Sequence, residues 1–446
     1  MACSWERLPI AVISSSVEYI RQVILFLTVH FSHCYDPLDP DGSITITFDI
    51  YQWRPDGYEA MVTVQNFYQY RHVEKPGWKL GWTWTQNEVI WTMTGALALR
   101  QGNCSAFNVQ TAHSCKRDPV IVDLMPEALP ENRTENCCRG GLVSAWGIDR
   151  RRSLSSFEML IGNLGGPRSY MPENLTFLGP GPGYTCGPLA DFPPTVFSST
   201  DVRREMQVFR TWKSTCTYSN FLANKVPICC VSLSTFYNSD VTPCPTCSCG
   251  CRLADKNTLS CISNEFSTSL STELDHLVRC TDHMCPVRVH WHIKNNYKEY
   301  WRVKLTVSNY NFGTNYTDWN VVVQHPGFGQ SIEYYSFNGT TLGTIRLADE
   351  VALFWGLTFY NDVLLQAVED QPGSVTTEIL LHKDLNTFTL ENGWAFPRRV
   401  YFNGENCEMP MPDNFPGLPN SSSNHGYGIL PLILALFLSF KILLWL

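Results

Sequence analysis

The sequence has few charged residues and an excess of acidic over basic ones. Charged residues make up 17% of the 446 residues, and 33 Lys and Arg stand against 41 Asp and Glu, for a net charge of -8. Broad nucleic-acid binding is not expected, because it requires a basic surface that neutralises phosphates. Apolar residues still account for 44% of the chain, a proportion typical of folded rather than disordered proteins.

Common enzyme motifs are also missing. The chain has no nucleophile elbow, zinc-binding helix, phosphate loop or dinucleotide fingerprint. Gly179–Gly183 is glycine-rich, but its prolines remove the amide donors that a phosphate cradle needs. Carboxylates such as Asp49, Glu88, Asp123 and Asp149 leave a glycan-active enzyme open as an alternative, because spacing in sequence does not give spacing in space. We predict a protein that is not an enzyme and has no cofactor or metal.

A hydrophobic run near the start is too short to span a bilayer. Arg21 precedes VILFLTVHF, Val23–Phe31, which is typical of the core of a signal peptide. A buried helix is the alternative. We predict a signal peptide at residues 1–34, with cleavage near Cys34.

The other end combines small polar residues with an apolar tail. PNSSSNHGYG is followed by ILPLILALFLSFKILLWL, the pattern of a GPI-attachment signal, which we place at residues 413–446. Pro431 and Lys441 disfavour the alternative, a tail-anchored transmembrane helix. The outer leaflet of the plasma membrane is therefore an expected partner. The candidate attachment residues are Asn420, Ser421, Ser422, Ser423 and Asn424.

N-glycosylation sequons agree with a secreted chain. A sixth sequon, at Asn420, falls at the expected anchor and is not expected to carry a glycan. The predicted glycosylation sites are Asn103, Asn132, Asn174, Asn315 and Asn338.

Alternating polar and apolar residues predict two similar β-sandwich domains. From Ile44 to Ile50 every second residue is apolar, and the pattern returns 243 residues later. Chance alignment of alternating strands is the alternative to an internal repeat. We place the sandwiches at residues 35–164 and 286–412. The matching pairs are Ile44 and Val287, Phe48 and Trp291, Tyr58 and Trp301, Val62 and Leu305, and Asn66 and Asn309.

Between the sandwiches, proline, glycine and cysteine accumulate. Residues 165–202 are dense in Pro and Gly, which predicts a linker or cross-connection. Residues 203–285 form a cysteine-rich segment. The expected fold is mainly β, with two β-sandwich domains joined by a Pro/Gly-rich linker and a disulfide-rich segment.

Cysteines are the most informative residues of that segment. Of 18, Cys3 and Cys34 leave with the signal peptide, and the even remainder in an oxidising compartment indicates disulfides. Zinc or redox chemistry at C-P-T-C, starting at Cys244, is the alternative. We expect the adjacent cysteines Cys137 and Cys138, like Cys229 and Cys230, to bridge outward to different partners. The predicted disulfide residues are Cys104, Cys115, Cys137, Cys138, Cys186, Cys216, Cys229, Cys230, Cys244, Cys247, Cys249, Cys251, Cys261, Cys280, Cys285 and Cys407.

Tryptophans follow one another at strand spacing in GWKLGWTWTQNEVIW, from Gly77 to Trp91. An aligned row of indole rings could stack on the sugar rings of an extended glycan, although a row of core residues is the alternative. Within the row, Trp78 is the best core candidate, because Trp319 follows the matching strand of the repeat. The candidate carbohydrate-binding residues are Trp53, Trp78, Trp82, Trp84 and Trp91.

Several motifs resemble the plant COBRA-like family over nearly all of the predicted mature chain. They include CCVS, YDPLDPDG, QYRHVEKPGWKLGW, GNCSAF, ENCCRGG, PGPGYTCG and GWAFPRRVYFNGENC. The resemblance implies a GPI-anchored protein of the plasma membrane surface and cell wall, associated with cellulose deposition, crystallinity and oriented cell expansion. It also implies that the N-terminal sandwich, residues 35–164, is similar to a carbohydrate-binding module, and it implies no catalytic residues. One departure is at Ser114, because the family commonly has two adjacent cysteines where this chain has only Cys115.

The expected function is therefore that of a non-catalytic wall protein that binds cellulose, a β-1,4-glucan. A surface protein that acts in adhesion or as a co-receptor, with a protein ligand, is the alternative.

Overall fold

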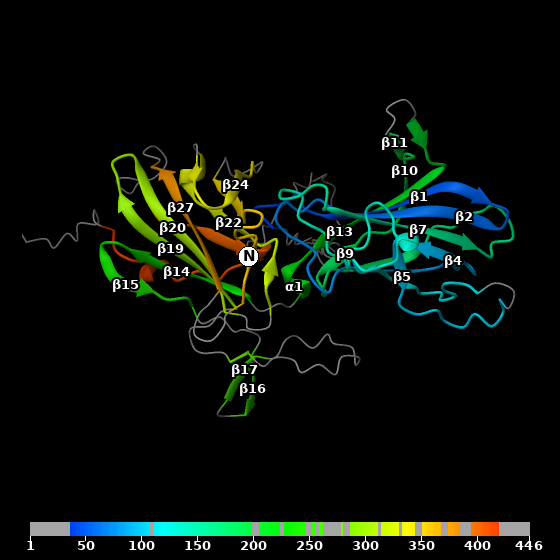
Figure 1. Ribbon diagram of the computed structural model, residues 1–446, viewed down its shortest axis with the longest axis horizontal. Helices are drawn as coiled ribbons and strands as arrows, with labels where there is room; N and C mark the ends of the chain where they lie inside the picture. Colours follow the sequence, from blue (N-terminus) through cyan, green and yellow to red (C-terminus); the bar gives the residue numbers. More distant parts are fainter. Residues whose placement is uncertain are drawn as a thin grey trace, which may run out of the picture. The chain divides into compact units, whose positions relative to one another are not determined.

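The computed structural model shows two compact units (Figure 1). Residues Met1–Val226 and Glu265–Ser271 belong to the N-terminal unit, and Pro227–Asn264 and Thr272–Leu446 to the C-terminal unit. Within the described ranges, no helix is long and apolar enough to cross a membrane. The prediction of a mainly β chain is confirmed. The structure describes residues 36–107, 111–198, 205–223, 227–245, 286–310, 314–329, 332–343, 350–366, 373–383 and 394–418, and the backbone alone of 251–255, 258–261 and 278–279.

The N-terminal unit is a sandwich of a seven-stranded and a four-stranded sheet. The first has the order β10-β13-β1-β2-β7-β4, with β9 also paired to β13, and the second has the order β5-β6-β3-β8. A hairpin of β11 and β12 is separate from both. The strands are β1 (Ile44–Arg54), β2 (Gly57–Asn66), β3 (Lys79–Thr83), β4 (Val89–Thr94), β5 (Ala96–Ala98), β6 (Val120–Asp123), β7 (Leu154–Gly162), β8 (Glu173–Leu178), β9 (Tyr184–Cys186), β10 (Ala190–Phe192), β11 (Val196–Ser198), β12 (Glu205–Gln207) and β13 (Arg210–Tyr218).

The C-terminal unit has the same two-layer design. A six-stranded sheet has the order β15-β14-β19-β20-β27-β23, and a five-stranded sheet has the order β24-β25-β22-β28-β29. Small sheets β16-β17-β18 and β21-β26 accompany them. The strands are β14 (Cys229–Thr235), β15 (Asn238–Thr242), β16 (Cys251–Asp255), β17 (Thr258–Cys261), β18 (Val278–Arg279), β19 (Val287–Asn296), β20 (Tyr300–Asn309), β21 (Tyr316–Thr317), β22 (Asn320–Gln324), β23 (Glu333–Tyr334), β24 (Asn338–Thr341), β25 (Val351–Trp355), β26 (Val363–Leu364), β27 (Gly373–His382), β28 (Arg399–Phe402) and β29 (Glu405–Asn406).

Helical structure in the described residues is short. The elements are α1 (Asn220–Ala223) and the 3-10 turns η1 (Pro130–Asn132), η2 (Pro326–Gly329) and η3 (Pro412–Asn414). Because alternate strand residues point to opposite faces, the apolar set of each β-hairpin enters the space between its two sheets. Each unit therefore has its own hydrophobic core.

The internal repeat extends to the register of strand pairing, which is the same in both units. Ile44 pairs with Asn66 in β1–β2, and Val287 pairs with Asn309 in β19–β20, so the offset of 243 is kept on both strands. The β-bulges also coincide, between Ile50 and Gln52 in one unit and between Ile293 and Asn295 in the other. The next strand differs, because β13 runs antiparallel to β1 whereas β14 runs parallel to β19.

The segment predicted as a linker, 165–202, instead supplies strands to the N-terminal unit. β8 pairs with β3, and β9 and β10 pair with β13. Proline and glycine limit β9 and β10 to three residues each, and β10 lies at the sheet edge, where missing amide donors are tolerated. The segment predicted as cysteine-rich, 203–285, is likewise divided, because β13 belongs to the first unit and β14 to the second.

The described residues contain five disulfides. As predicted, Cys229 and Cys230 bridge to different partners. The prediction for the other adjacent pair is wrong, since Cys137 and Cys138 bond to each other. The bonds are Cys104–Cys115, Cys137–Cys138, Cys186–Cys216, Cys229–Cys407 and Cys230–Cys244. Cys247, Cys249, Cys280 and Cys285, and the side chains of Cys251 and Cys261, lie outside the described residues.

Candidate carbohydrate-binding surface

Three of the predicted sugar-binding tryptophans lie in the core of the N-terminal unit. The side chains of Trp78, Trp82 and Trp84 are 1%, 2% and 0% exposed. The ring of Trp78 stacks on Phe157 with centroids 6.0 Å apart, and Trp82 meets Phe48 edge-on at 5.4 Å. A ring packed on both sides offers no face to a sugar, so the prediction of glycan binding is wrong for these three residues. The core role considered for Trp78 is confirmed.

Trp53 occupies the end of the same core. It pairs across the strands with Tyr58, whose side chain is fully buried, so both point to the inner side of the seven-stranded sheet. The Trp53 ring is half-buried, 6.3 Å from the rings of Tyr58 and Phe209. Phe209 is 61% exposed. Trp53 therefore belongs to the aromatic rim of the core rather than to a flat surface.

Trp91 lies on the opposite, outward side of that sheet. It is the extra residue of a β-bulge between Ile90 and Thr92 on the edge strand β4. Its indole lies against Gly162, where a Cβ would be only 2.3 Å from the Trp91 Nε1 atom. Gly162 points outward because its neighbour Ile161 is a core residue. Glycine is thus required for the ring to lie on the sheet.

The residues that share this side form what we call the outer face. Its members come from β1, β2, β4, β7, β10 and β13, and they are half-buried or exposed. They alternate with the core residues of the same strands, so they project away from the second sheet. The outer face consists of Thr47, Tyr51, Met61, Thr63, Gln65, Trp91, Glu158, Leu160, Phe192, Lys213 and Thr215.

Three aromatic rings are spread across the outer face. Trp91 is on the edge strand β4, Tyr51 on the inner strand β1, and Phe192 on the opposite edge strand β10. With neighbouring strands about 4.8 Å apart, Trp91 and Tyr51 are separated across the sheet by about 14 Å, and Tyr51 and Phe192 by about 10 Å. Phe192 is 52% exposed, and the Lys213 ammonium lies 4.7 Å from its ring centroid. The rings are thus spaced along a line that crosses the strands.

Polar groups between the rings are fixed by hydrogen bonds. The hydroxyl of Tyr51 donates to Glu158 Oε2 at 3.3 Å. Burial, with the nearby Glu158 carboxylate, raises the pKa of Tyr51 above its ordinary value, so the phenol keeps its proton. Beneath this layer the Thr211 hydroxyl donates to Asp49 at 2.6 Å. Burial raises the pKa of Asp49, which is the mark of a structural carboxylate rather than a solvated one.

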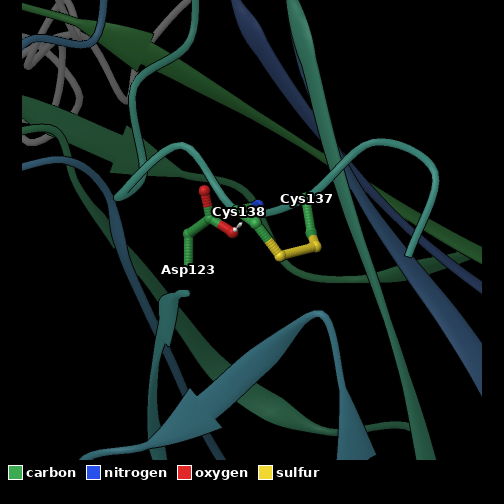
Figure 2. Close-up of side chains that lie close together, drawn as sticks. All are labelled: Asp123, Cys137 and Cys138. Carbon is green, nitrogen blue, oxygen red and sulfur yellow. Dashed lines mark hydrogen bonds between the residues drawn. A yellow bond between two sulfur atoms is a disulfide. The ribbon is translucent and has the colours of Figure 1, made fainter. Parts of the chain in front are cut away.

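A different cluster could suggest a metal centre. Figure 2 shows Asp123 beside Cys137 and Cys138, and one donor atom from each residue lies within 4.8 Å of the others. The two sulfurs, however, are joined in a disulfide, so neither is a thiolate ligand. The Asp123 carboxylate accepts the backbone amides of Cys138, Arg139 and Gly141 at 2.8–2.9 Å. The cluster therefore serves to clamp this loop.

The same clamp gives a physical reason for the unexpected disulfide. Cys138 has a left-handed backbone, with φ at 73°, and its amide is held by Asp123. This turn leaves the two neighbouring sulfurs in contact. Cys115 is bonded to Cys104, and the position before it is the buried Ser114, which has no thiol to offer.

The sequence-predicted modification sites divide by exposure. Asn103, Asn132, Asn174 and Asn315 are exposed. Asn338 is half-buried on β24, and its Nδ2 atom, to which a glycan would be attached, donates to the Gly356 carbonyl at 3.1 Å. The signal peptide and the candidate anchor residues 420–424 lie outside the described residues.

Two surface rings were missed by the sequence reasoning. Tyr51 follows Thr45, Thr47 and Asp49 on the polar face of β1, so an aromatic residue at that point of the alternation was a usable signal. Phe192 lies in a three-residue strand flanked by prolines, where no periodicity can be detected.

These features define a disulfide-bonded protein of two β-sandwich units, with aromatic rings on the outer face of the N-terminal unit. Residues 58–219 match the family model of the COBRA N-terminal domain, and residues 228–416 match that of the COBRA family C-terminal domain. The chain belongs to the COBRA family.

Relatives match along most of the chain. It is 48% identical to COBRA-like protein 2 of Arabidopsis thaliana over 419 residues, which cover 93% of this chain and 94% of the relative. It is 46% identical to Protein COBRA of the same plant over 447 residues, 96% and 98% of the two chains. With COBRA-like protein 1 of Oryza sativa subsp. japonica it shares 49% over 401 residues, 88% and 89% of the two chains. Neither family model nor these relatives are described as enzymes, and family membership supports a role at the cell surface or in the cell wall.

Proposed function

We propose that this protein binds cellulose through the outer face of its N-terminal unit and assists microfibril deposition without catalysing a reaction. The observation that carries the proposal is the line of Trp91, Tyr51 and Phe192 across one sheet face. Aromatic rings can stack on the apolar faces of glucose units, and the intervening threonine, glutamine and glutamate side chains can bond to sugar hydroxyls. Oriented cell expansion would follow from ordered deposition of the glucan.

Affinity for a single glucan chain should be weak. Each ring contact contributes about 0.5–1.5 kcal/mol, by analogy with aromatic pairs. Three rings therefore supply at most about 4.5 kcal/mol, which corresponds to a Kd near the millimolar range before hydrogen bonds are added. A crystalline surface that offers many chains, and an anchor that holds the protein near it, would raise the effective affinity.

The anchor that we propose is a GPI group near residues 420–424, on the extracellular side of the plasma membrane. It is supported by the apolar C-terminal tail and the small polar residues before it. Release of the protein from intact cells by a GPI-specific phospholipase tests this part. A chain that stays with the membrane after complete cleavage of a control GPI protein refutes it.

Binding is tested by retention on crystalline cellulose. We expect the single variants Trp91→Ala and Tyr51→Ala to lose about 2- to 10-fold in partition constant, as expected for the loss of one ring contact. The matched control is Phe359→Ala, which removes a ring that is 100% exposed on the C-terminal unit. Thermal unfolding of each variant separates lost binding from lost folding.

Two results would count against the proposal. Equal retention of Trp91→Ala, Tyr51→Ala and Phe359→Ala would exclude the outer face as the binding surface. Recovery of a stoichiometric protein partner, with no glucan retention by the folded wild-type chain, would favour the co-receptor alternative.

A further inference from the structure

The C-terminal unit has an equivalent outward face, but its charge is reversed. The internal repeat relates each position of β1–β2 to one of β19–β20, with the same register and bulge. At four outward positions the N-terminal unit has Thr45, Tyr51, Glu59 and Met61, whereas the C-terminal unit has Arg288, Lys294, Arg302 and Lys304. We call the second set, with His290, His292 and Glu378, the basic face.

The basic face keeps a net positive charge after its internal ion pairs are counted. Glu378 bonds to Lys294 at 2.6 Å and to Arg302 at 2.7 Å, so one carboxylate is shared by two cations. Glu158, at the equivalent position of the N-terminal unit, instead accepts a hydrogen bond from the neutral hydroxyl of Tyr51. Four cations and one carboxylate give +3, whereas the equivalent N-terminal positions, with Glu59 and Glu158, give -2. The exposed Glu333 on the edge strand β23 faces the same side, because it pairs with Leu380, and adds one negative charge at that edge of the sheet.

Several cations on this face are available to a ligand. Lys304 is exposed, and the side chains of Lys294 and Arg302 are 44% and 37% exposed. Among the described residues, Lys304 has no acidic partner in ion-pair contact. Arg288 is half-buried, with its guanidinium 5.1 Å from the Tyr310 ring centroid. The face can therefore take up negative charge without breaking the pairs that Glu378 makes.

The middle of the basic face is a layer of neutral hydrogen-bonding groups. His290 lies 2.5 Å from the Ser232 hydroxyl and 2.9 Å from that of Ser234, and His292 lies 2.7 Å from the latter. Burial, followed by the charge of Arg288, lowers the pKa of His290 to about 4. Burial and the nearby Lys304 also lower the pKa of His292. Ser232 and Ser234 are buried, and both ring nitrogens of His290 are engaged by them, so this layer holds the strands together. The half-buried His292, bonded to Ser234 through Nδ1, is the imidazole of this layer that a ligand can reach.

We propose that the basic face binds an anionic polysaccharide whose sugar units carry carboxylates, a polyuronate. The four cations lie on the neighbouring strands β19 and β20 and are spread along them, with Arg288 and Lys294 six residues, or about 20 Å, apart. This arrangement suits an extended polymer with charges along its length. Arg and Lys recognise the carboxylates, and the half-buried His292 can bond to a neighbouring hydroxyl. This ligand is anionic, whereas the glucan proposed for the outer face is uncharged. The chain would therefore connect a neutral and an acidic wall polymer.

The test is binding of the full chain to immobilised polygalacturonic acid. Each cation is replaced by the residue at the equivalent position of the N-terminal unit, which is Thr45 for Arg288 and Met61 for Lys304. These replacements are conservative, because the equivalent strands β1 and β2 accommodate them. We expect Arg288→Thr/Lys304→Met to bind about 2- to 25-fold more weakly, at about 1.4- to 5-fold for each of the two cations. Added salt should weaken wild-type binding in the same way. The control Arg151→Gln removes an exposed cation from the N-terminal unit and should have no effect.

Other arms of the experiment separate the possible ligands. Fully methyl-esterified polygalacturonan keeps the backbone without its charge, so equal binding to it would overturn the proposal. If Arg288→Thr/Lys304→Met bound polygalacturonic acid as tightly as the wild type, the proposal would also be overturned. The same holds if this variant lost binding to anionic lipid vesicles but kept its binding to polygalacturonic acid. Retention on cellulose should be unchanged in this variant, so failure here is distinct from failure of the proposed glucan function.

Discussion

Replacement of Trp82 by alanine should destabilise the N-terminal unit strongly. Its side chain is 2% exposed and lies between the rings of Phe48 and Trp84, each with centroids 5.4 Å away in edge-on contact. The buried Trp82 Nε1 atom makes no hydrogen bond within the described residues, so the loss comes from packing. Truncation of a buried tryptophan costs about 3–5 kcal/mol. For a unit of this size, that corresponds to a fall in Tm of about 6–20 °C.

Differential scanning calorimetry of the full chain measures this effect. The transition of the N-terminal unit should fall, and that of the C-terminal unit should stay in place. Trp91→Ala serves as the control, because its half-buried ring lies on the outer face and should shift the same transition by much less. A Trp82→Ala protein that keeps its Tm but loses cellulose retention would refute the assignment of this ring to the core.

The remaining predictions concern the C-terminal unit. Burial lowers the pKa of His325 to about 3, so between pH 6.5 and pH 3 the unfolded chain binds a proton that the folded chain does not. In urea unfolding, the stability of the wild type should therefore fall below pH 6.5 more steeply than that of His325→Gln, by about 1.4 kcal/mol per pH unit, and equal slopes would contradict the assignment to this residue. Peptide mass spectrometry after enzymatic deglycosylation should find glycans at Asn174 but not at Asn338, whose Nδ2 is engaged; full occupancy of Asn338 would contradict the packing. Cys407→Ser should cost about 2–5 kcal/mol, seen as a lower midpoint of this unit alone, because its bond to Cys229 closes a long loop. An unchanged midpoint would show that this bond does not constrain the unfolded chain.

Alternation was enough to predict the paired long strands of both units. The period of two placed Ile44 and Val287 on buried faces, and the fixed offset anticipated a register that the structure keeps through the bulge. This succeeded because one face of each hairpin is buried, so a slip of one residue would expose the whole apolar set.

The same pattern could not say which face of β3 met solvent. Trp78 and Trp82 both enter the core, where their neighbours Phe157 and Phe48 come from β7 and β1, far away in sequence. A row of rings fits a core or a platform equally well until the opposing sheet is known. Conversely, Trp91 reaches the surface through a bulge, which breaks the alternation.

The disulfide partners of the cysteines could not be predicted from the sequence for a related reason. Cys216 and Cys229 sit beside the first residues of their repeats, opposite Ile44 and Val287 respectively. Their disulfide partners are separated from them by 30 and 178 residues. Only the sheet order brings these pairs together, and spacing along the chain contains no information on it.

The most direct measurement is hydroxyl-radical footprinting of the full chain with and without crystalline cellulose. The account predicts that oxidation of Trp91, Tyr51 and Phe192 falls together on binding, while the exposed Phe359 of the C-terminal unit is oxidised as before. Protection of Phe359 with unchanged oxidation of the three outer-face rings would contradict it and place the glucan contact on the other unit.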